Sequence, residues 1–502
     1  MPMLKDLIQA AAEANEPSLV IASDVQPGGV DPLGLRQINF NLMDKVLPGL
    51  NNVAEMLRPF VLMTWAWRRV RVIIERDKLG GATDEDMRDF VDRIEAIYAW
   101  SQFLNDPSAR LPGGQALQGL LYGVEDSYHF GGTEWTSRRD LRRTSTGLIS
   151  PLNYGPGLRM MGWLVPAGPP GVFQPCSDLG TMLDEFENGF SDILEHPVFN
   201  KLGPVTVGRD EARQWGELWA LSDLTSAERT AGFERLAGQH ADKFRREGLE
   251  LIQIAAQQVA DADDIDDRVA SIRELMAAPA EAWLPVSELA DRAQAWRRLQ
   301  VRQLFRLALE ATFSWTLQQL VDGPQTTEML ADRFVADNDI LKFERAGEWL
   351  GEEVANNPVP LLYELAGTLA LRDWQNAPPA IAKALRFCLF SASFDGLDPA
   401  EPRERLSLCR AVEEFDGWSE CSPAQLMSKI LEIWVIAQHT YWCVGRGLAD
   451  ARGNGKTLLR LRIVMDEGGW TLTPGTVVGA PPVATPDRLR TAYSLLQECG
   501  HL

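Results

Sequence analysis

The chain has 502 residues, of which 45% are apolar and 24% are charged, so it is long enough for two or three domains and has an ordinary globular composition. Its net charge of −21 argues against a protein that coats nucleic acid or anionic membrane without specificity. The six cysteines show no paired spacing, and no run reaches the roughly 18 apolar residues of a membrane span. We therefore expect a cytoplasmic protein with reduced thiols and no membrane partner.

Helical patterns dominate the first half of the chain. Residues 101–175 interrupt them; they are rich in Gly and Pro, and we expect long loops there with short strands at most. Capping boxes, in which a Thr is followed three residues later by an acidic side chain, mark two helix starts. The predicted helices cover residues 3–15, 53–74, 83–100, 182–194 and 225 to about 259.

The second half is also helical, except near its end. Residues 458–465 alternate apolar and basic side chains, Asp466–Gly469 supplies a turn, and a second short strand begins at Trp470. Further helices are predicted over 287–320, 326–374, 379–390, 423–444 and 486–498.

The predicted fold is mainly α and multi-helical, with a small C-terminal β-hairpin/helix subdomain. Composition shifts divide the chain into three consecutive segments. These are an N-terminal helical region with long irregular loops (1–176), a central helical domain (177–396), and a C-terminal helix plus hairpin subdomain (397–502).

The helix predicted over residues 53–74 is the most informative segment. It is apolar almost all round, yet it carries four arginines. Two apolar faces indicate a helix that is packed on both sides, so we expect Arg58 and Arg69 to be buried and paired with carboxylates. If the helix begins at Asn52, Pro59 should kink it.

Glu125, Asp126 and His129 form the densest polar cluster of the irregular region. Carboxylates beside a histidine can perform acid–base chemistry or bind a metal, so these three are the candidate catalytic residues of an otherwise unknown active site. They could equally form a loop network that satisfies buried backbone groups. No Gly-x-Ser-x-Gly elbow and no paired zinc ligands occur, and we expect no metal site and no cofactor.

Other motifs are incomplete. Gly453–Thr457 looks like the end of a phosphate-binding loop, but Asp450 occupies its first glycine position and a strand follows where a helix is required. His439, on a predicted helix, is expected to be a core histidine. The sequence therefore favours a non-enzymatic role.

Two further clusters place arginines behind a tryptophan. Residues 298, 302 and 306 are four apart and share one helix face. Such stripes suit phosphate clamping and base stacking. The alternative is pairing within the protein, which the 70 acidic residues and the position of Glu310 favour. The candidate nucleic-acid ligands are Arg138, Arg139, Arg142, Arg143, Arg298, Arg302 and Arg306.

The segment Val46–Trp67 joins a Pro-Gly-Leu-Asn-Asn turn to the arginine-bearing aromatic helix. In this it resembles uncharacterised helical proteins of bacterial antiviral-defence gene clusters. The resemblance is confined to these residues and supplies no catalytic residue. It implies a bacterial protein that works in phage defence beside a helicase, nuclease or ATPase.

These observations give one leading hypothesis and two alternatives. We expect an accessory or scaffold subunit of a multi-gene anti-phage system, acting through contacts with the other subunits. The alternatives are a metal-dependent nuclease and a nucleic-acid-binding protein that uses the arginine and tryptophan clusters.

Overall fold

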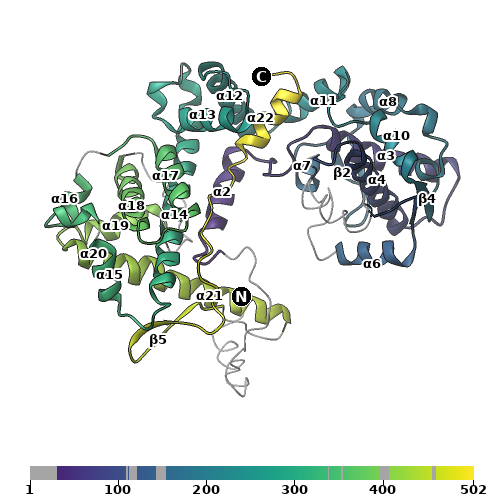
Figure 1. Ribbon diagram of the computed structural model, residues 1–502. Coiled ribbons are helices and arrows are strands. Elements are labelled where there is room, and N and C mark those ends of the chain that lie inside the picture. Colours follow the sequence, from purple (N-terminus) through teal and green to yellow (C-terminus); the bar gives the residue numbers. More distant parts are fainter. Residues whose placement is uncertain are drawn as a thin grey trace. The chain divides into compact units, whose positions relative to one another are not determined.

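The computed structural model (Figure 1) is mainly α-helical, and in the described part its strands form three two-stranded antiparallel sheets. This confirms the predicted multi-helical fold with a hairpin near the C-terminus. No helix among the described residues combines the length and the apolar content that crossing a bilayer requires. The helix predicted over 3–15 lies outside the described residues. These are residues 31–502 without 109–110, 112–120, 122, 143–153, 337, 352–353, 395–405 and 455–459.

The chain divides into two compact units, which are described separately. Unit 1 consists of the residues up to Asn39 together with Gln300–Ala484, and unit 2 of Phe40–Leu299 together with Thr485–Leu502. Unit 2 is thus made of two stretches that most of unit 1 separates in sequence. The domain boundaries predicted from the sequence, 1–176, 177–396 and 397–502, differ from the bounds of these units and stay a prediction.

Unit 2 has a core of helices and aromatic side chains, with two short sheets. Strand β1 pairs with β4 from Ser127↔Gly208 to Phe130↔Val205, and β2 pairs with β3. Its elements are α3 (Arg58–Arg76), α4 (Asp84–Asn105), β1 (Ser127–Phe130), α6 (Thr133–Arg142), α7 (Gly155–Met160), β2 (Leu164–Pro166), β3 (Phe173–Pro175), α8 (Gly180–Asn188), α9 (Pro197–Asn200), β4 (Val205–Gly208), α10 (Arg209–Leu218), α11 (Ser226–Ala237), α12 (Lys243–Gln258), α13 (Ile265–Ala277) and α22 (Leu489–Glu498).

Helix α3 is the predicted central helix, and it is buried along most of its length between α4, α8 and β3. It begins at Arg58 and not at Asn52, so the predicted start is wrong. The side chain of Asn51 instead accepts the backbone N–H groups of Val53 and Ala54, which forms a turn. Pro59 then lies in the first helical turn, where it replaces no helical hydrogen bond; the predicted kink is therefore wrong too.

The capping boxes at Thr83 and Thr225 are both present and start α4 and α11. The second helix is shorter than predicted. It ends at Ala237, and Asp242 caps a new helix, α12, because its carboxylate accepts the N–H groups of Phe244 and Arg245.

Unit 1 is helical around the β5–β6 hairpin. Its helices pack in pairs, α15 on α20 and α17 on α18. A π-helical stretch, Ile430–Ile436, joins α20 to α21. The elements are α15 (Thr327–Ala336), α16 (Ala346–Gly351), α17 (Pro358–Ala370), α18 (Ala377–Phe394), α19 (Leu408–Asp416), α20 (Pro423–Lys429), α21 (Ala437–Asn454), β5 (Ile463–Asp466) and β6 (Gly469–Leu472).

Two helices, α2 (Arg36–Val46) and α14 (Ala290–Gln319), run through the sequence boundaries between the units. Helix α14 has 30 residues, which confirms the long helix predicted near 287–320. Within unit 1, the amide of Asn39 donates to the Gln303 side chain at 3.0 Å. The first turn of α2 is therefore tied to α14 by polar side chains.

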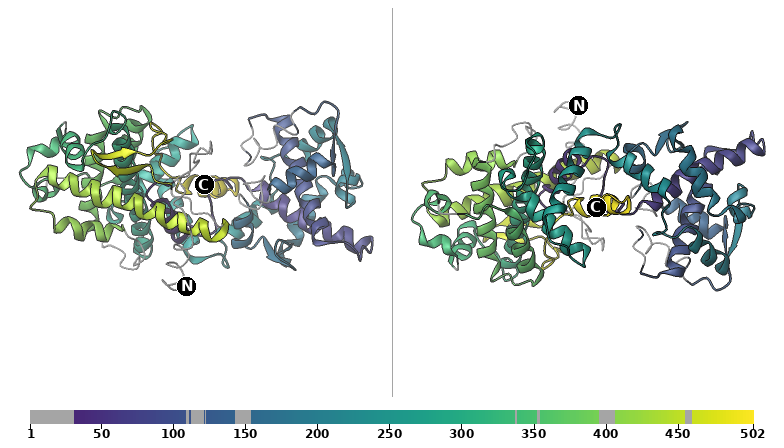
Figure 2. Two further views of the ribbon diagram at one scale, coloured as in Figure 1. Left: turned by 90° about the horizontal axis from the view of Figure 1, so that it is seen from below. Right: turned by 90° about the horizontal axis from the view of Figure 1, so that it is seen from above.

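The predicted hairpin is confirmed, with a two-residue turn between Asp466 and Gly469. Residues just before β5 are bound to α21, because the Cys443 thiol donates to the Arg460 carbonyl and the Arg462 N–H donates to His439. The hairpin and α21 lie side by side in Figures 1 and 2.

The close packing of α10 on α4 gives a stability prediction. A Cβ atom added at Gly216 on α10 would lie 2.7 Å from the backbone carbonyl oxygen of Ser101 on α4 and would also meet Asn105. We expect Gly216→Ala to lower the free energy of unfolding by roughly 1–3 kcal/mol, because α4 and α10 must move apart. Urea unfolding followed by circular dichroism measures this.

A matched control is Gly367→Ala on α17, where no atom lies within 4 Å of the added Cβ. This change should raise stability by about 0.5–1 kcal/mol through helix propensity alone. Equal effects of the two substitutions would contradict the close packing of α4 on α10.

Candidate functional site

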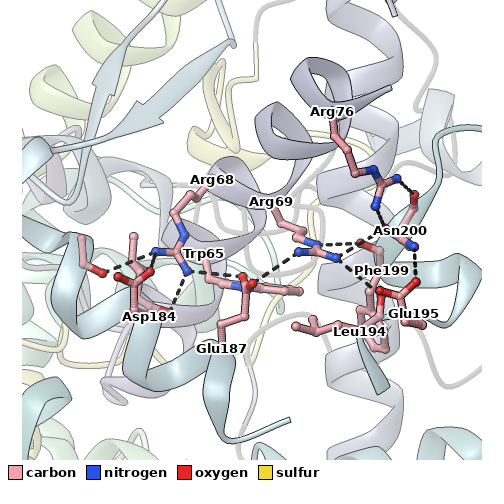
Figure 3. A network of polar contacts seen from close by, with 12 residues as sticks. Trp65, Arg68, Arg69, Arg76, Asp184, Glu187, Leu194, Glu195, Phe199 and Asn200 are labelled. Atoms are coloured by element: carbon pink, nitrogen blue, oxygen red, sulfur yellow. Dashed lines mark hydrogen bonds and ion pairs between the residues drawn. The ribbon is translucent and has the colours of Figure 1, made fainter. Parts of the chain in front are cut away.

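The arginines of α3 bind a network of acceptors on α8 and on the segment 194–200 (Figure 3). The centre of this α3 network is the carboxylate of Glu187 on α8. It accepts the indole N–H of Trp65 at 2.7 Å, Arg68 Nη2 at 3.3 Å and Arg69 Nη1 at 3.3 Å. One carboxylate therefore bridges two guanidinium groups and also accepts a hydrogen bond from a buried tryptophan.

Both arginines also bind further acceptors. Arg68 binds Asp184 at 2.5 Å and the backbone carbonyl of Leu183 at 2.9 Å. Arg69 is buried, and its Nε donates to the backbone carbonyl of Phe199 at 2.9 Å. The predicted burial and pairing of Arg69 are thus confirmed. The network joins α3 to α8 and α9.

Arg58 lies at the start of α3 and forms a second, more deeply buried pair. Its Nη1 is 3.1 Å from Glu228 Oε1, and the two side chains are only 4% and 0% exposed. Its Nη2 donates to the backbone carbonyl of Asp223, and its guanidinium lies 5.3 Å from the centre of the Phe186 ring. Burial raises the pKa of Glu228, although the charge of Arg58 opposes this shift. The predicted burial and pairing of Arg58 are confirmed.

A second carboxyl, the half-buried Glu498 at the end of α22, lies near this pair. Its Oε2 accepts the backbone N–H of Leu57 at 2.5 Å, and Arg229 donates to its backbone carbonyl. Burial raises the pKa of Glu498 to about 7, against the opposing charges of Arg229 and Arg58. Arg58, Glu228, Arg229 and Glu498, here called the Arg58 cluster, connect α3, α11 and α22.

The Arg58 cluster holds a carboxyl that can exchange a proton near neutral pH. Its acceptor oxygen is nevertheless bound to the start of α3, and Glu228 is bound to Arg58 and closes the capping box of α11. Among the described residues, no group of three or more His, Cys, Asp or Glu side chains is arranged to hold a metal ion. The contacts of the Arg58 cluster hold α3, α11 and α22 together, which is a structural role.

The arginine stripe of α14 is largely internal. Within unit 1, Arg306 is fully buried and binds Glu310 Oε2 at 2.8 Å; the same oxygen accepts Arg36 at 3.2 Å. Arg302 is also buried and donates to the backbone carbonyl of Leu406 at 2.9 Å. A nucleic-acid phosphate could reach Arg302 and Arg306 only if α14 were unpacked. Their contacts support the alternative of pairing within the protein, and Arg298 is half-buried.

The other arginine candidates lie on or beyond α6. The backbones of Arg138, Arg139 and Arg142 are helical, their side chains lie outside the described part, and Arg143 lies outside it altogether. The indole of Trp135 is buried and donates to Asp89 at 3.4 Å. This tryptophan is therefore a core residue and offers no exposed face for base stacking.

The catalytic candidates lie on β1 and on the residues just before it. Glu125, Asp126 and His129 are all exposed. His129 faces Thr206 across the β1–β4 register, and its Nδ1 lies 2.9 Å from the Thr206 hydroxyl. The backbone carbonyl of Asp126 accepts the N–H of Arg209. These contacts resemble the loop-network alternative, and the catalytic assignment stays a prediction.

His439 is a core histidine, as the sequence predicted. Its Nδ1 is 2.8 Å from the backbone carbonyl of Pro32, and its Nε2 is 3.0 Å from the N–H of Arg462. One nitrogen must donate and the other must accept, so the ring is neutral. Burial lowers the pKa of His439 to about 4, consistent with this assignment. The ring joins the N-terminal segment to the residues before β5 and has no nitrogen left for catalysis.

The sequence pattern does not indicate Glu187 or Glu498 as partners of these arginines, and it marks Glu228 only as part of a capping box. A local signal existed for Glu228 alone, because a capping-box glutamate sits at a fixed spacing from its threonine.

A scan of protein-family models gives no match, and searches of curated proteins and of solved structures give none either. The resemblance of Val46–Trp67 to defence-cluster proteins therefore stays a prediction.

The Arg58 pair gives the second prediction. Arg58→Ala would leave Glu228 buried without its partner, and we expect the free energy of unfolding to fall by roughly 3–5 kcal/mol. Chemical unfolding monitored by tryptophan fluorescence tests this. The control is Arg213→Ala, which removes an exposed pair with Asp210 and should have almost no effect. A variant of Arg58 that unfolds like the parent would show that the pair is not structural.

Glu498 gives a pH prediction. Its pKa is raised in the folded protein from an ordinary 4.5 to about 7, so the folded state holds the proton more tightly. The stabilisation from this group is complete below about pH 4.5 and is lost as the pH rises through about 7. Glu498→Gln keeps an oxygen for Leu57 but cannot ionise. We expect it to be more stable than the parent at pH 8, by roughly 1–3 kcal/mol.

This difference should shrink toward pH 5, where the parent is also protonated. Urea unfolding at a series of pH values measures it. Parallel pH profiles for the two proteins would mean that Glu498 titrates normally in the fold.

Proposed function

We propose that the chain is an accessory or scaffold subunit of a bacterial anti-phage defence system and acts through protein–protein contacts. The observation that carries this proposal is the internal use of the arginines. Arg68, Arg69, Arg302 and Arg306 bind carboxylates and backbone carbonyls of the same unit. These side chains hold the fold together, which is the role that a scaffold requires of them. The defence setting is supported by the resemblance of Val46–Trp67.

The charge of the chain also favours protein partners. With 70 acidic and 49 basic residues, it repels polyanions at long range. The buried arginines leave an excess of carboxylates to face solvent. Partners with basic surfaces would therefore associate faster and more strongly than acidic ones.

A co-expression experiment tests the proposal. The chain, with an affinity tag, is produced together with the products of its neighbouring genes and purified at moderate salt. We expect a complex of fixed stoichiometry by light scattering, and we expect deletion of the gene to raise the plaquing efficiency of phage. A monomeric chain whose deletion leaves phage sensitivity unchanged would overturn the proposal.

The two alternatives have their own tests. A nuclease should degrade DNA or RNA with Mg²⁺ or Mn²⁺, and Glu125→Gln or His129→Ala should abolish this. A nucleic-acid binder should lose affinity steeply with salt, and Arg138→Glu with Arg142→Glu should remove most of it. We expect no turnover, and no binding that these substitutions weaken.

A further inference from the structure

The β5–β6 hairpin has one edge that another segment covers and one that, among the described residues, is open at Met465. On the covered side, Trp470 exchanges two backbone hydrogen bonds with Gln325, at 3.1 Å and 2.8 Å. In an antiparallel ladder, neighbouring residues of a strand point their N–H and C=O groups to opposite sides. Because Trp470 directs these groups toward Gln325, it forms a non-hydrogen-bonded pair with Met465, its partner on β5. The N–H and C=O of Met465 therefore point away from β6.

The outer edge of β5 is accessible. The side chains of Met465 and Val464 are 60% and 37% exposed, and Asp466 and Glu467 are also exposed. Within the described ranges, no backbone partner lies along this edge at Met465. Proteins normally cover an edge strand or place a charged residue on it, most often a lysine, because an open edge can pair with another strand. Strand β5 has no lysine, and its exposed residues are Val464, Met465 and Asp466.

The surroundings of the hairpin turn carry negative charge. Asp466 and Glu467 lie at the turn itself. Asp322 and Glu328 are also exposed, but they lie beside Gln325, along the edge of β6 that is opposite to the outer edge of β5. A strand that pairs with β5 would therefore meet the carboxylates of Asp466 and Glu467 at the turn end. A second copy of this chain is a poor occupant, because each copy carries a net charge of −21.

We propose that the outer edge of β5 is a docking site for an extended, basic segment of a partner protein. The segment would add a strand beside Met465 and place lysine or arginine side chains next to Asp466 and Glu467. Main-chain hydrogen bonds would supply affinity, and the charges would supply selectivity and register. This inference rests on the proposed function, since it identifies where the subunit holds its partner.

The length of β5 limits the strength of the contact. Strand β5 has four residues, and only Met465 and Ile463 have backbone N–H and C=O groups that point away from β6. Ile463, at the end of the strand away from the turn, is buried. The strand addition is therefore short, and electrostatic attraction must contribute a large share of the affinity. Binding should weaken clearly as salt is raised.

The probe is a fluorescein-labelled peptide that alternates lysine and valine, tested against one that alternates glutamate and valine. Fluorescence anisotropy with the full chain measures binding. We expect the basic peptide to bind at least tenfold more tightly than the acidic one. Hydrogen exchange should slow at the Met465 amide when the basic peptide is present.

Two variants test the two parts of the proposal. Met465→Pro removes the outward N–H, a change that an edge strand tolerates, and should weaken peptide binding at least tenfold. Asp466→Lys combined with Glu467→Lys should reverse the preference, so that the acidic peptide binds more tightly. The matched control is Asp263→Lys, an exposed site on unit 2, which should change neither affinity.

Several results would overturn the proposal. These are no binding of the basic peptide, equal binding of both peptides, or binding that Met465→Pro leaves intact while circular dichroism shows a folded protein. A dimer that Met465→Pro dissociates would make a second copy the occupant instead.

The co-expressed complex separates this inference from the proposed function. If Met465→Pro and the charge reversal leave the complex with the neighbouring gene products intact, the β5 site is wrong and the proposed function stands. If the parent chain forms no complex at all, the proposed function fails.

Discussion

The fold depends on hydrogen-bond acceptors for the guanidinium groups of buried arginines. An arginine keeps its charge when buried, so each one requires fixed acceptors, and most of the acceptors here are remote in sequence. Arg93 binds the backbone carbonyls of Val198, Lys201 and Gly203, and burial lowers its pKa to about 10. Arg245 binds the carbonyls of Pro48, Arg235 and Leu236 in the same way. The arginines thus bind carbonyls of turns, of the short helix α9 and of the last turn of α11.

This use of arginine connects the fold to the outer surface. A guanidinium that backbone carbonyls bind inside, as at Arg93 and Arg245, no longer offsets a carboxylate at the surface, so each such arginine leaves the exterior more acidic. An acidic exterior attracts basic partners electrostatically, and this attraction acts before any side chains are in contact. The edge of β5 would also orient a bound strand, because the N–H and C=O of Met465 point in fixed directions.

Much of the fold could be predicted from local patterns. The helix starts at Thr83 and Thr225 and the turn of the hairpin each depend on residues within a few positions of one another. The burial of Arg58 and Arg69 could also be predicted, from the apolar residues on both faces of their helix. Their partners could not, since Glu498 is 441 residues from the Leu57 N–H that it accepts. The predicted start of α3 is wrong because Asn52 and Glu55 have the spacing of a capping box. In the structure the Asn52 side chain instead accepts the backbone N–H of Arg488.

The return of the last residues to unit 2 has a consequence for how the protein is made. Leu489, Leu495 and Leu496 belong to the core of unit 2, and Asp487 binds Arg273 at 2.6 Å. On the ribosome, the rest of that core is synthesised long before α22 leaves the exit tunnel. The core of unit 2 therefore stays incomplete, with an apolar surface exposed, while residues 300–484 of unit 1 are translated. Packing of α22 is therefore a late folding step of unit 2, and a chain that stops before α22 would leave this apolar surface exposed.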